Sequence, residues 1–293
     1  MLPPTLCATL CAAGRLSSGD LATASDALRA AGGEPGATVW RDAGDAADLA
    51  VTGLTQPAAR GAVEAALPAV DVVVQPAAAR RVMALLIADM DSTLISCECI
   101  DELADYAGLK PQVAAITAAA MRGELDFVAA LDARVALLAG LPVAVLDQCR
   151  RERVRLMPGA ATLVATMRGH GALMILVSGG FTAFAGPVGA ELGFDRIVAN
   201  TLLTDAGHLT GAVARPVIDG GTKRAELIAA GVPLAHCLAV GDGANDIPML
   251  VAAGLGIAYH AKPRAAAAAD AAVRHGDLTV LLWAQGIRRA DWR

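Results

Sequence analysis

Aromatic residues are scarce in this chain, at 3% of its 293 residues. Apolar residues nevertheless make up 55% of the sequence, so we expect a sizeable core built mainly from Ala, Val and Leu. Charged residues are also few, at 18%, and the formal net charge is −5. That balance lacks the basic footprint of a nucleic-acid-binding protein, so we expect no nucleic-acid partner.

The six cysteines lack the spacing of a metal or redox site. Cys97-Glu98-Cys99 is too short for a CxxC motif, and no second Cys or His pair completes a metal site. We therefore expect thiols in a reducing cytosol. No run approaches the roughly 18 apolar residues that span a bilayer, and no basic segment of a signal peptide precedes the first apolar stretch. The sequence predicts a soluble, cytoplasmic protein with no membrane partner.

Residues 1–80 contain no cluster of chemically reactive side chains. Thr38–Trp40 and Asp71–Val74 are expected to be short strands, and Gln56–Leu67 between them a helix. These elements predict a small α+β domain, followed by a linker at Ala77–Arg81. The sequence leaves open a regulatory or a dimerising role for this domain. It also leaves open a homodimer of the chain.

Residues 82–293 alternate between apolar runs and helical patterns. Continuous apolar runs are typical of strands that are buried on both faces of a parallel sheet. The expected strands are Val82–Ala88, Ala172–Val177, Cys237–Val240 and Leu255–Ala258, with helices such as Ala160–Arg168 and Lys223–Ala230 among them. The alternation predicts an α/β fold with a parallel sheet.

A stretch at about residues 98–156 interrupts this alternation with helical patterns alone. Four helices are expected there, at Glu98–Ala107, Pro111–Arg122, Asp126–Ala139 and Pro142–Leu156. An insertion after the first strand would lie over the carboxyl edge of the sheet as a cap. Caps of this kind exclude water from a site.

Polar clusters follow three of the expected strands. They are Asp89-Met90-Asp91, Ser178-Gly179-Gly180 and Gly241–Asp246. Because ligands bind beyond the carboxyl ends of the strands in such sheets, we expect the three clusters to converge. Taken singly, they also fit a capping Asp, a tight turn and an Asx-rich turn.

Carboxylates would be crowded where these clusters meet, since Asp89, Asp91, Asp242 and Asp246 all lie at strand ends. A bound cation is the simplest way to relieve their repulsion, and a sulfur-free oxygen ligand set suits Mg²⁺. Lys223, one of only three lysines, is expected near a helix start, where its charge opposes the helix dipole. An anion bound nearby would offset that cost, although a surface lysine is the alternative.

As a set, the motifs resemble those of the haloacid dehalogenase superfamily. The matching segments are Asp89–Thr93, Ser178–Phe181, Lys223 and Gly241–Asp246. Met121–Phe127 and Arg134–Leu138 resemble, in addition, the phosphoserine phosphatase family of that superfamily. The resemblance covers roughly residues 82–275 and implies a doubly wound parallel-sheet core with a helical cap inserted after the first strand.

The resemblance also implies a catalytic mechanism. Asp89 would attack phosphorus and form an aspartyl-phosphate, and Asp91 would protonate the departing oxygen and then activate water. Mg²⁺ would be held by Asp89, Asp242 and the main-chain carbonyl of Asp91. These assignments imply hydrolysis of O-phosphoserine to serine and phosphate, the last step of serine biosynthesis.

The remaining implied roles concern the substrate. Ser178, the Gly179 N–H and Lys223 would hold the phosphate oxygens, with Asn245 beside them and Asp246 supporting Lys223. In the cap, Glu98 would meet the substrate's ammonium group and Arg134 its carboxylate, with Phe127 on the same helix face as Arg134.

Two alternatives stay open. A superfamily phosphatase or phosphotransferase for another small phosphoester would carry the same four motifs, and only the three cap residues distinguish it. A non-catalytic amino-acid sensor built on residues 1–80 is the other alternative. It would have no need of Asp91, so the complete set of acids argues against it.

Overall fold

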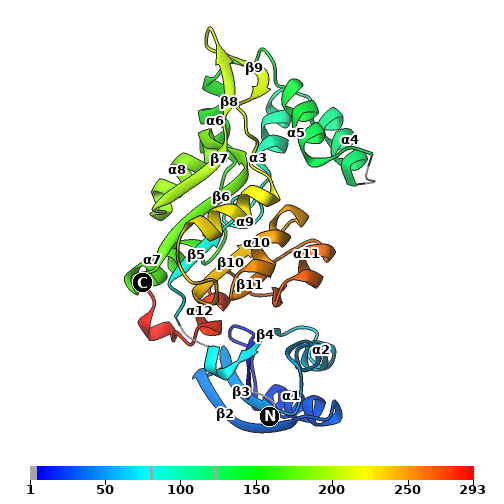
Figure 1. Cartoon of the computed structure of the whole chain (residues 1–293), viewed down its shortest axis with the longest axis vertical. Coiled ribbons are helices and arrows are strands. Elements are labelled where there is room, and N and C mark those ends of the chain that lie inside the picture. Colours follow the sequence, from blue (N-terminus) through cyan, green and yellow to red (C-terminus); the bar gives the residue numbers. More distant parts are fainter. Residues whose placement is uncertain (1–4, 80–81, 122–123) are drawn as a thin grey trace.

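The computed structural model describes residues 5–79, 82–121 and 124–293. Within these residues the strands form a four-stranded, a six-stranded and a two-stranded sheet. Figure 1 shows them along one long axis, with the N-terminal sheet at one end, the six-stranded sheet in the middle and the two-stranded sheet at the other end.

An N-terminal unit of two helices and four strands has its own apolar core, which includes Leu10, Leu28 and Leu49. Its antiparallel sheet has the order β2-β3-β1-β4. The elements are β1 (Leu6–Cys11), α1 (Ser18–Ala30), β2 (Glu34–Asp42), β3 (Ala46–Thr52), α2 (Gln56–Ala66) and β4 (Asp71–Pro76). The sequence predicted parts of β2, α2 and β4 but not β1, α1 or β3. The many alanines of α1 and β3 favour neither a strand nor a helix clearly from the sequence.

The six-stranded sheet is parallel throughout, in the order β12-β11-β10-β5-β6-β7. Its strands are β5 (Leu85–Ala88), β6 (Leu173–Phe181), β7 (Arg196–Asn200), β10 (Cys237–Gly241), β11 (Leu255–Tyr259) and β12 (Ala271–Val273). Every residue of β5, β10 and β11 is buried, as expected for strands covered on both faces. The predicted α/β fold class is confirmed.

Among the strand boundaries that differ from the prediction, two lie next to the polar clusters or the linker. β5 begins at Leu85, not at Val82, which is exposed. β6 continues through the glycines to Phe181, with an irregular register after Val177. Ser178 and Gly179 therefore lie on the end of the strand and not in a turn after it.

Helices flank the parallel sheet (Figure 1). They are α7 (Ala160–Gly169), α8 (Thr182–Leu192), α9 (Gly220–Ala229), α10 (Ile247–Ala252), α11 (Pro263–Ala268) and α12 (Val280–Ala284). Asp219 caps α9, since its side chain accepts a hydrogen bond from the Thr222 amide at 2.8 Å. This cap fixes the first turn of the helix that carries Lys223.

The cap contains four helices, as predicted; three are shorter than expected, and α4 is shifted by one residue. They are α3 (Cys99–Tyr106), α4 (Lys110–Met121), α5 (Phe127–Ala136) and α6 (Ala144–Arg153). Asp126 caps α5, whereas the expected end of α4 at Arg122 lies outside the described residues. A hairpin of β8 (Leu202–Asp205) and β9 (His208–Val213), which the sequence did not reveal, packs against α5.

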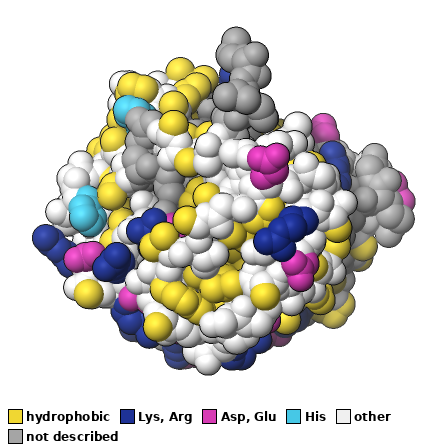
Figure 2. Space-filling view, turned by 90° about the horizontal axis from the view of Figure 1, so that it is seen from below, with side chains coloured by type: hydrophobic (Ala, Val, Ile, Leu, Met, Phe, Trp, Pro, Cys, Tyr) yellow, Lys and Arg dark blue, Asp and Glu magenta, His cyan; other side chains and the backbone are white. Residues whose placement is uncertain are grey.

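Charge on the molecule's end face is mixed. Figure 2 shows this face, on which basic, acidic and apolar side chains are interspersed and several basic side chains lie beside acidic ones. None of the helices described has the length and apolar character needed to cross a membrane.

Candidate active site

A pocket of about 160 Å³ lies at the carboxyl ends of β5, β6 and β10, beneath the cap. Most of the predicted site residues line it. They are Asp89, Asp91, Glu98, Phe127, Arg134, Ser178, Gly179, Asp242 and Asn245. The other two, Lys223 and Asp246, lie directly behind Asp89. The structure thus brings all of these side chains to one place.

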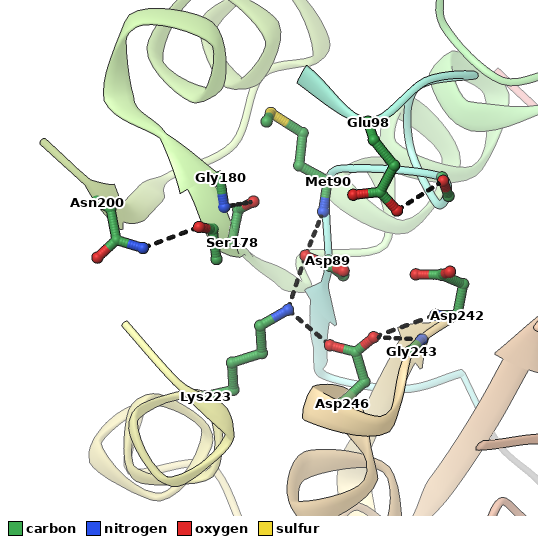
Figure 3. Close-up of polar contacts among 12 residues, drawn as sticks. Asp89, Met90, Glu98, Ser178, Gly180, Asn200, Lys223, Asp242, Gly243 and Asp246 are labelled. Carbon is green, nitrogen blue, oxygen red and sulfur yellow. Dashed lines mark hydrogen bonds and ion pairs between the residues drawn. The ribbon is translucent and has the colours of Figure 1, made fainter. Parts of the chain in front are cut away.

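A buried lysine connects two of the acids. Lys223 is fully buried, and its Nζ lies 2.7 Å from Asp89 Oδ1 and 2.6 Å from Asp246 Oδ1 (Figure 3). The sequence left a surface lysine open as an alternative, and the structure excludes it. A buried ammonium group requires such carboxylate partners, because removal from water penalises its charge.

Asp246 is saturated by its neighbours. Its Oδ2 accepts hydrogen bonds from the amides of Asp242 and Gly243 at 3.1 and 2.9 Å, while Oδ1 faces Lys223. This carboxylate therefore holds the turn after β10 and orients the lysine.

A divalent cation fits the acids that remain. Carboxylate oxygens of Asp89, Asp242 and Asp246 lie within 4.8 Å of one another. Since Asp246 is already satisfied, Asp89 and Asp242 are the carboxylates left for a cation. Asp91 Oδ1 is buried and has no hydrogen-bond partner among the residues that the structure describes. Such a concentration of buried, incompletely paired oxygen ligands is what a hard cation requires.

The pKa values of these acids also indicate that the site lacks positive charge. Burial and the Asp246 carboxylate raise the pKa of Asp89 above its usual range, despite the opposing effect of Lys223. Burial also raises the pKa of Asp242 to about 6. Burial opposes the charge on Lys223, but the carboxylates of Asp246 and Asp89 outweigh it and raise the pKa of the lysine. A cation bound here would favour the ionised form of both acids.

Asp91 is in a different situation from Asp89. Burial and the nearby Glu98 carboxylate raise the pKa of Asp91 to about 7. A carboxyl group with that pKa can both donate and accept a proton near neutral pH. The two acids therefore differ in their surroundings: Asp89 is oriented by Lys223, whereas Asp91 faces the pocket and can exchange a proton near neutral pH.

Because Gly179 and Gly180 have no side chains, β6 can lie close to Asp91 and to Phe127 of the cap. A β-carbon on Gly180 would lie 2.7 Å from Asp91 Oδ2, and one on Gly179 would lie 3.3 Å from Phe127 Cζ. Ser178 Oγ accepts a hydrogen bond from the Gly180 amide at 2.9 Å. The sequence singled out Gly179 as an anion-binding amide, but the steric restriction at Gly180 required the structure.

The cap residues face the core acids. Ser92 donates a hydrogen bond to Glu98 at 3.2 Å, and Arg134 donates one from Nε to the Ala130 carbonyl at 3.2 Å. Arg134 lines the pocket with its helix neighbour Phe127. The pocket thus has acids at its base and one acidic and one basic side chain on its cap.

Sequence reasoning missed two residues at this site. Asn200, at the end of β7, donates to the Gly179 carbonyl at 2.8 Å and accepts from the Ile218 amide at 2.9 Å. No motif marks it. Lys262 also lines the pocket and lies 3.7 Å from Asp242. Its rarity as one of three lysines was a usable signal, but it was interpreted only as a charge that interrupts an Ala-rich region.

Known proteins resemble the chain in the region of this site. A family model of haloacid dehalogenase-like hydrolases matches residues 86–251. A phosphoserine phosphatase from Streptomyces coelicolor is 47% identical over 253 residues, which are 84% of this chain and 62% of the relative. A phosphoserine phosphatase from Polaromonas sp. is 49% identical over 207 residues, which are 68% of this chain and 88% of the relative. The chain therefore spans less than two thirds of the first relative and most of the second.

A solved structure extends the likeness to the whole chain. The unliganded structure of a probable phosphoserine phosphatase from Vibrio cholerae is 31% identical, with a TM-score of 0.76. The match covers 98% of this chain and 88% of that one. The similarity therefore includes the N-terminal unit as well as the sheet and cap.

Proposed function

The chain belongs to the haloacid dehalogenase-like hydrolases, and from that membership we propose that it hydrolyses O-phosphoserine to serine and phosphate. The observation that carries the proposal is the composition of one small pocket. It combines the Asp89–Lys223 pair at its base with Glu98 and Arg134 on its cap. Phosphoserine presents a phosphate, an ammonium and a carboxylate close together, so its charges match this arrangement.

In the proposed reaction, a carboxylate oxygen of Asp89 attacks phosphorus and the bond from phosphorus to the seryl oxygen breaks. Asp91 gives its proton to that oxygen, so serine leaves as the neutral alcohol. Asp91 then removes a proton from water, whose oxygen attacks the aspartyl-phosphate and releases phosphate and the Asp89 carboxylate. The raised pKa of Asp91, about 7, suits both of its proton transfers.

Mg²⁺ is the proposed cofactor. Asp89, Asp242 and the main-chain carbonyl of Asp91 would hold it, and its charge would neutralise the phosphate as phosphorus is transferred. The buried acids with raised pKa values, Asp89 and Asp242, support this assignment. In the absence of the cation we expect these acids to repel a phosphate dianion.

The other contacts orient the substrate. Ser178, the Gly179 amide and Lys223 would bind phosphate oxygens, with Asn245 next to them. Arg134 would bind the carboxylate through two parallel hydrogen bonds, for which its planar guanidinium is suited. Glu98 would accept hydrogen bonds from the ammonium group.

A panel of phosphomonoesters, assayed for phosphate release with Mg²⁺ and with excess chelator, tests the proposal. We expect phosphoserine to be the best substrate and chelator to abolish turnover. A different preferred ester would support the alternative of a superfamily phosphatase or phosphotransferase for another small phosphoester. Full activity in chelator would contradict the metal assignment.

Substitution of Arg134 separates specificity from chemistry. A hydrogen bond to a charged group contributes roughly 1.5–3 kcal/mol, so Arg134→Ala should lower kcat/KM for phosphoserine by about one to two powers of ten. Nitrophenyl phosphate has no carboxylate and should be affected much less. Arg151→Ala, on the exposed side of α6, is the control. Equal losses on both substrates would mean that Arg134 stabilises the cap and does not select phosphoserine.

Other expectations from the sequence stay predictions. They are a cytoplasmic location, a possible regulatory or dimerising role for residues 1–80, and domain boundaries near residue 81. We propose that residues 82–293 contain all the catalytic groups, because every residue assigned above lies in that range.

A further inference from the structure

Lys262 lies where the core and the cap meet. Its side chain is 60% exposed, and its Nζ is 3.7 Å from Asp242 Oδ2 and 4.0 Å from Glu98 Oε1. The Lys262 amide also donates a hydrogen bond to the Asp242 carbonyl at 3.0 Å. Both the backbone amide and the ammonium group of Lys262 therefore contact Asp242. The positive charge lies between Asp242 of the core and Glu98 of the cap.

The N-terminal unit holds the far end of the helix that follows Lys262. Lys262 is the N-cap residue of α11, which ends at Ala268. Arg60, on α2, donates hydrogen bonds to the carbonyls of Ala269 at 2.7 Å and Ala266 at 3.2 Å. The Arg60 side chain is only 13% exposed, and Glu64 orients it from 2.8 Å. A cation at a helix C-terminus satisfies carbonyls that have no partner within the helix.

Asp71, at the start of β4, provides a second connection. Its buried carboxylate accepts hydrogen bonds from the amides of Arg274 at 2.7 Å, His275 at 3.2 Å and Gly276 at 2.6 Å. The Gly276 carbonyl contacts the His260 ring at 2.9 Å. His260, two residues before Lys262, has a φ of 44°, which few non-glycine residues adopt, and its amide donates to Val273 at 2.8 Å.

The segment from residue 260 to residue 276 is thus attached to the N-terminal unit on one side and to the active site on the other. Figure 1 shows α11 between α2 and the carboxyl edge of the sheet. With only six residues, α11 is too short to bend, so a shift at its C-terminus moves Lys262. The contacts from Arg60 to Asp242 are contiguous, which is the physical requirement for coupling of this kind.

We propose that Lys262 contributes to binding and closure at the pocket by bridging Asp242 and Glu98, and that Arg60 and Asp71 are positioning residues that hold it there. The N-terminal unit then acts on the reaction although it contains no catalytic group. This inference rests on the proposed function. It assigns to the N-terminal unit, residues 5–79, the task of setting the position of one cation at the substrate pocket.

Kinetics of single variants test the role of Lys262. We expect Lys262→Gln to lower kcat/KM for phosphoserine about tenfold, mainly through a higher KM. Lys110→Gln is the matched control, because Lys110 is also 60% exposed and pairs with an acid, Asp105, at 3.9 Å, but lies away from the pocket. Equal kinetics of Lys262→Gln and wild type would overturn the assignment.

A double-mutant cycle tests the coupling. Arg60→Ala should lower kcat/KM about three- to tenfold, and the double variant with Lys262→Gln should be no worse than Lys262→Gln alone. Arg29→Ala, on α1 of the same unit, should behave as wild type, since Arg29 is exposed and pairs with the exposed Asp26. Losses that multiply in the double variant would show that Arg60 does not act through Lys262.

Hydrogen exchange supplies a readout that needs no activity. In Arg60→Ala the amides of His260 and Lys262 should exchange faster than in wild type, while those of β5 stay protected. If wild type released phosphate from no ester, the proposed function would fail, yet this comparison would still decide the coupling. Should Arg60→Ala not fold, the same measurement on Asp71→Asn decides it. Unchanged exchange at His260 and Lys262 in a folded variant contradicts the proposal.

Discussion

The space between β6 and Asp91 leaves no room for a side chain at Gly180. A β-carbon there would lie 2.7 Å from Asp91 Oδ2, so Gly180→Ala must displace the acid–base group or the strand. Misplacement of a catalytic group by about 1 Å can cost on the order of a hundredfold in rate, and we expect a loss in kcat of about that size. Gly186→Ala on α8, where a β-carbon meets nothing within 4 Å, is the control. Similar kcat values for the two variants would contradict this view of the site.

Asp91 should also make the stability of the metal-free protein depend on pH. Its pKa is raised to about 7 in the folded chain from the ordinary 3.8 of an aspartic acid, because burial and Glu98 favour the protonated form. The stabilisation from this group is therefore complete below about pH 4 and is lost as the pH rises to about 7. Asp91→Asn mimics the protonated acid.

Denaturant unfolding in excess chelator measures this effect. The difference in unfolding free energy between Asp91→Asn and wild type should grow in favour of the variant from pH 4 to pH 7 and then level off. Asp205→Asn, on exposed β8, controls for the loss of one charge. A difference that does not change with pH would mean that Asp91 titrates normally.

The sequence predicted that the pocket acids converge, because parallel strands bring their carboxyl ends to a common edge, whatever their separation in the chain. Asp89 and Asp242 could be brought together by that rule alone. Asn200 could not, since it acts by bridging two backbone groups and shares no motif with them. Lys262 shows its partners only once the chain is folded, because the loop before α11 determines where its side chain lies.

Helix α9 exists at its observed position because Asp219 caps it, and it carries Lys223 to Asp89. Asp219→Ala should destabilise the protein by about 0.5–2 kcal/mol and also lower kcat, because the first turn of α9 would loosen. Ser17→Ala removes the cap of α1 and should cost similar stability without affecting kcat. Thermal unfolding and steady-state kinetics on both variants compare the two effects. Equal kcat values would show that the position of Lys223 does not depend on its cap.

Elements were predictable where hydrophobic contrast is strong. β5 and β10 are continuous apolar runs that end in acids, so both were recognised. β3 was not, because alanine favours strands weakly and its sequence contains no aromatic residue. The glycines at the end of β6 fitted a tight turn as well as an anion site, and neither interpretation showed that the strand continues through them to Phe181. The β8–β9 hairpin comes from outside the expected cap segment, and a one-dimensional pattern does not show that it packs on α5.

Across the whole chain, the N-terminal unit and the C-terminal segment are joined by polar contacts. Asp42, at the end of β2, accepts hydrogen bonds from the Trp283 indole at 2.6 Å and the Arg289 amide at 2.9 Å. Asp42→Ala leaves both donors without this acceptor, which should cost about 1–3 kcal/mol of unfolding free energy. Urea unfolding measures it, with Asp26→Ala in an exposed pair as the control. Equal stability of the two variants would show that this contact does not hold the units together.

The identity of the nucleophile is the central claim, and covalent trapping tests it most directly. Phosphoserine labelled on phosphorus would be mixed with enzyme and Mg²⁺, quenched in acid within the first turnovers, and the labelled peptide mapped by mass spectrometry. We expect the label on Asp89, and neither label nor turnover in Asp89→Asn, whose amide is a poor nucleophile. Label on Ser178, or turnover by Asp89→Asn at the wild-type rate, would contradict the account.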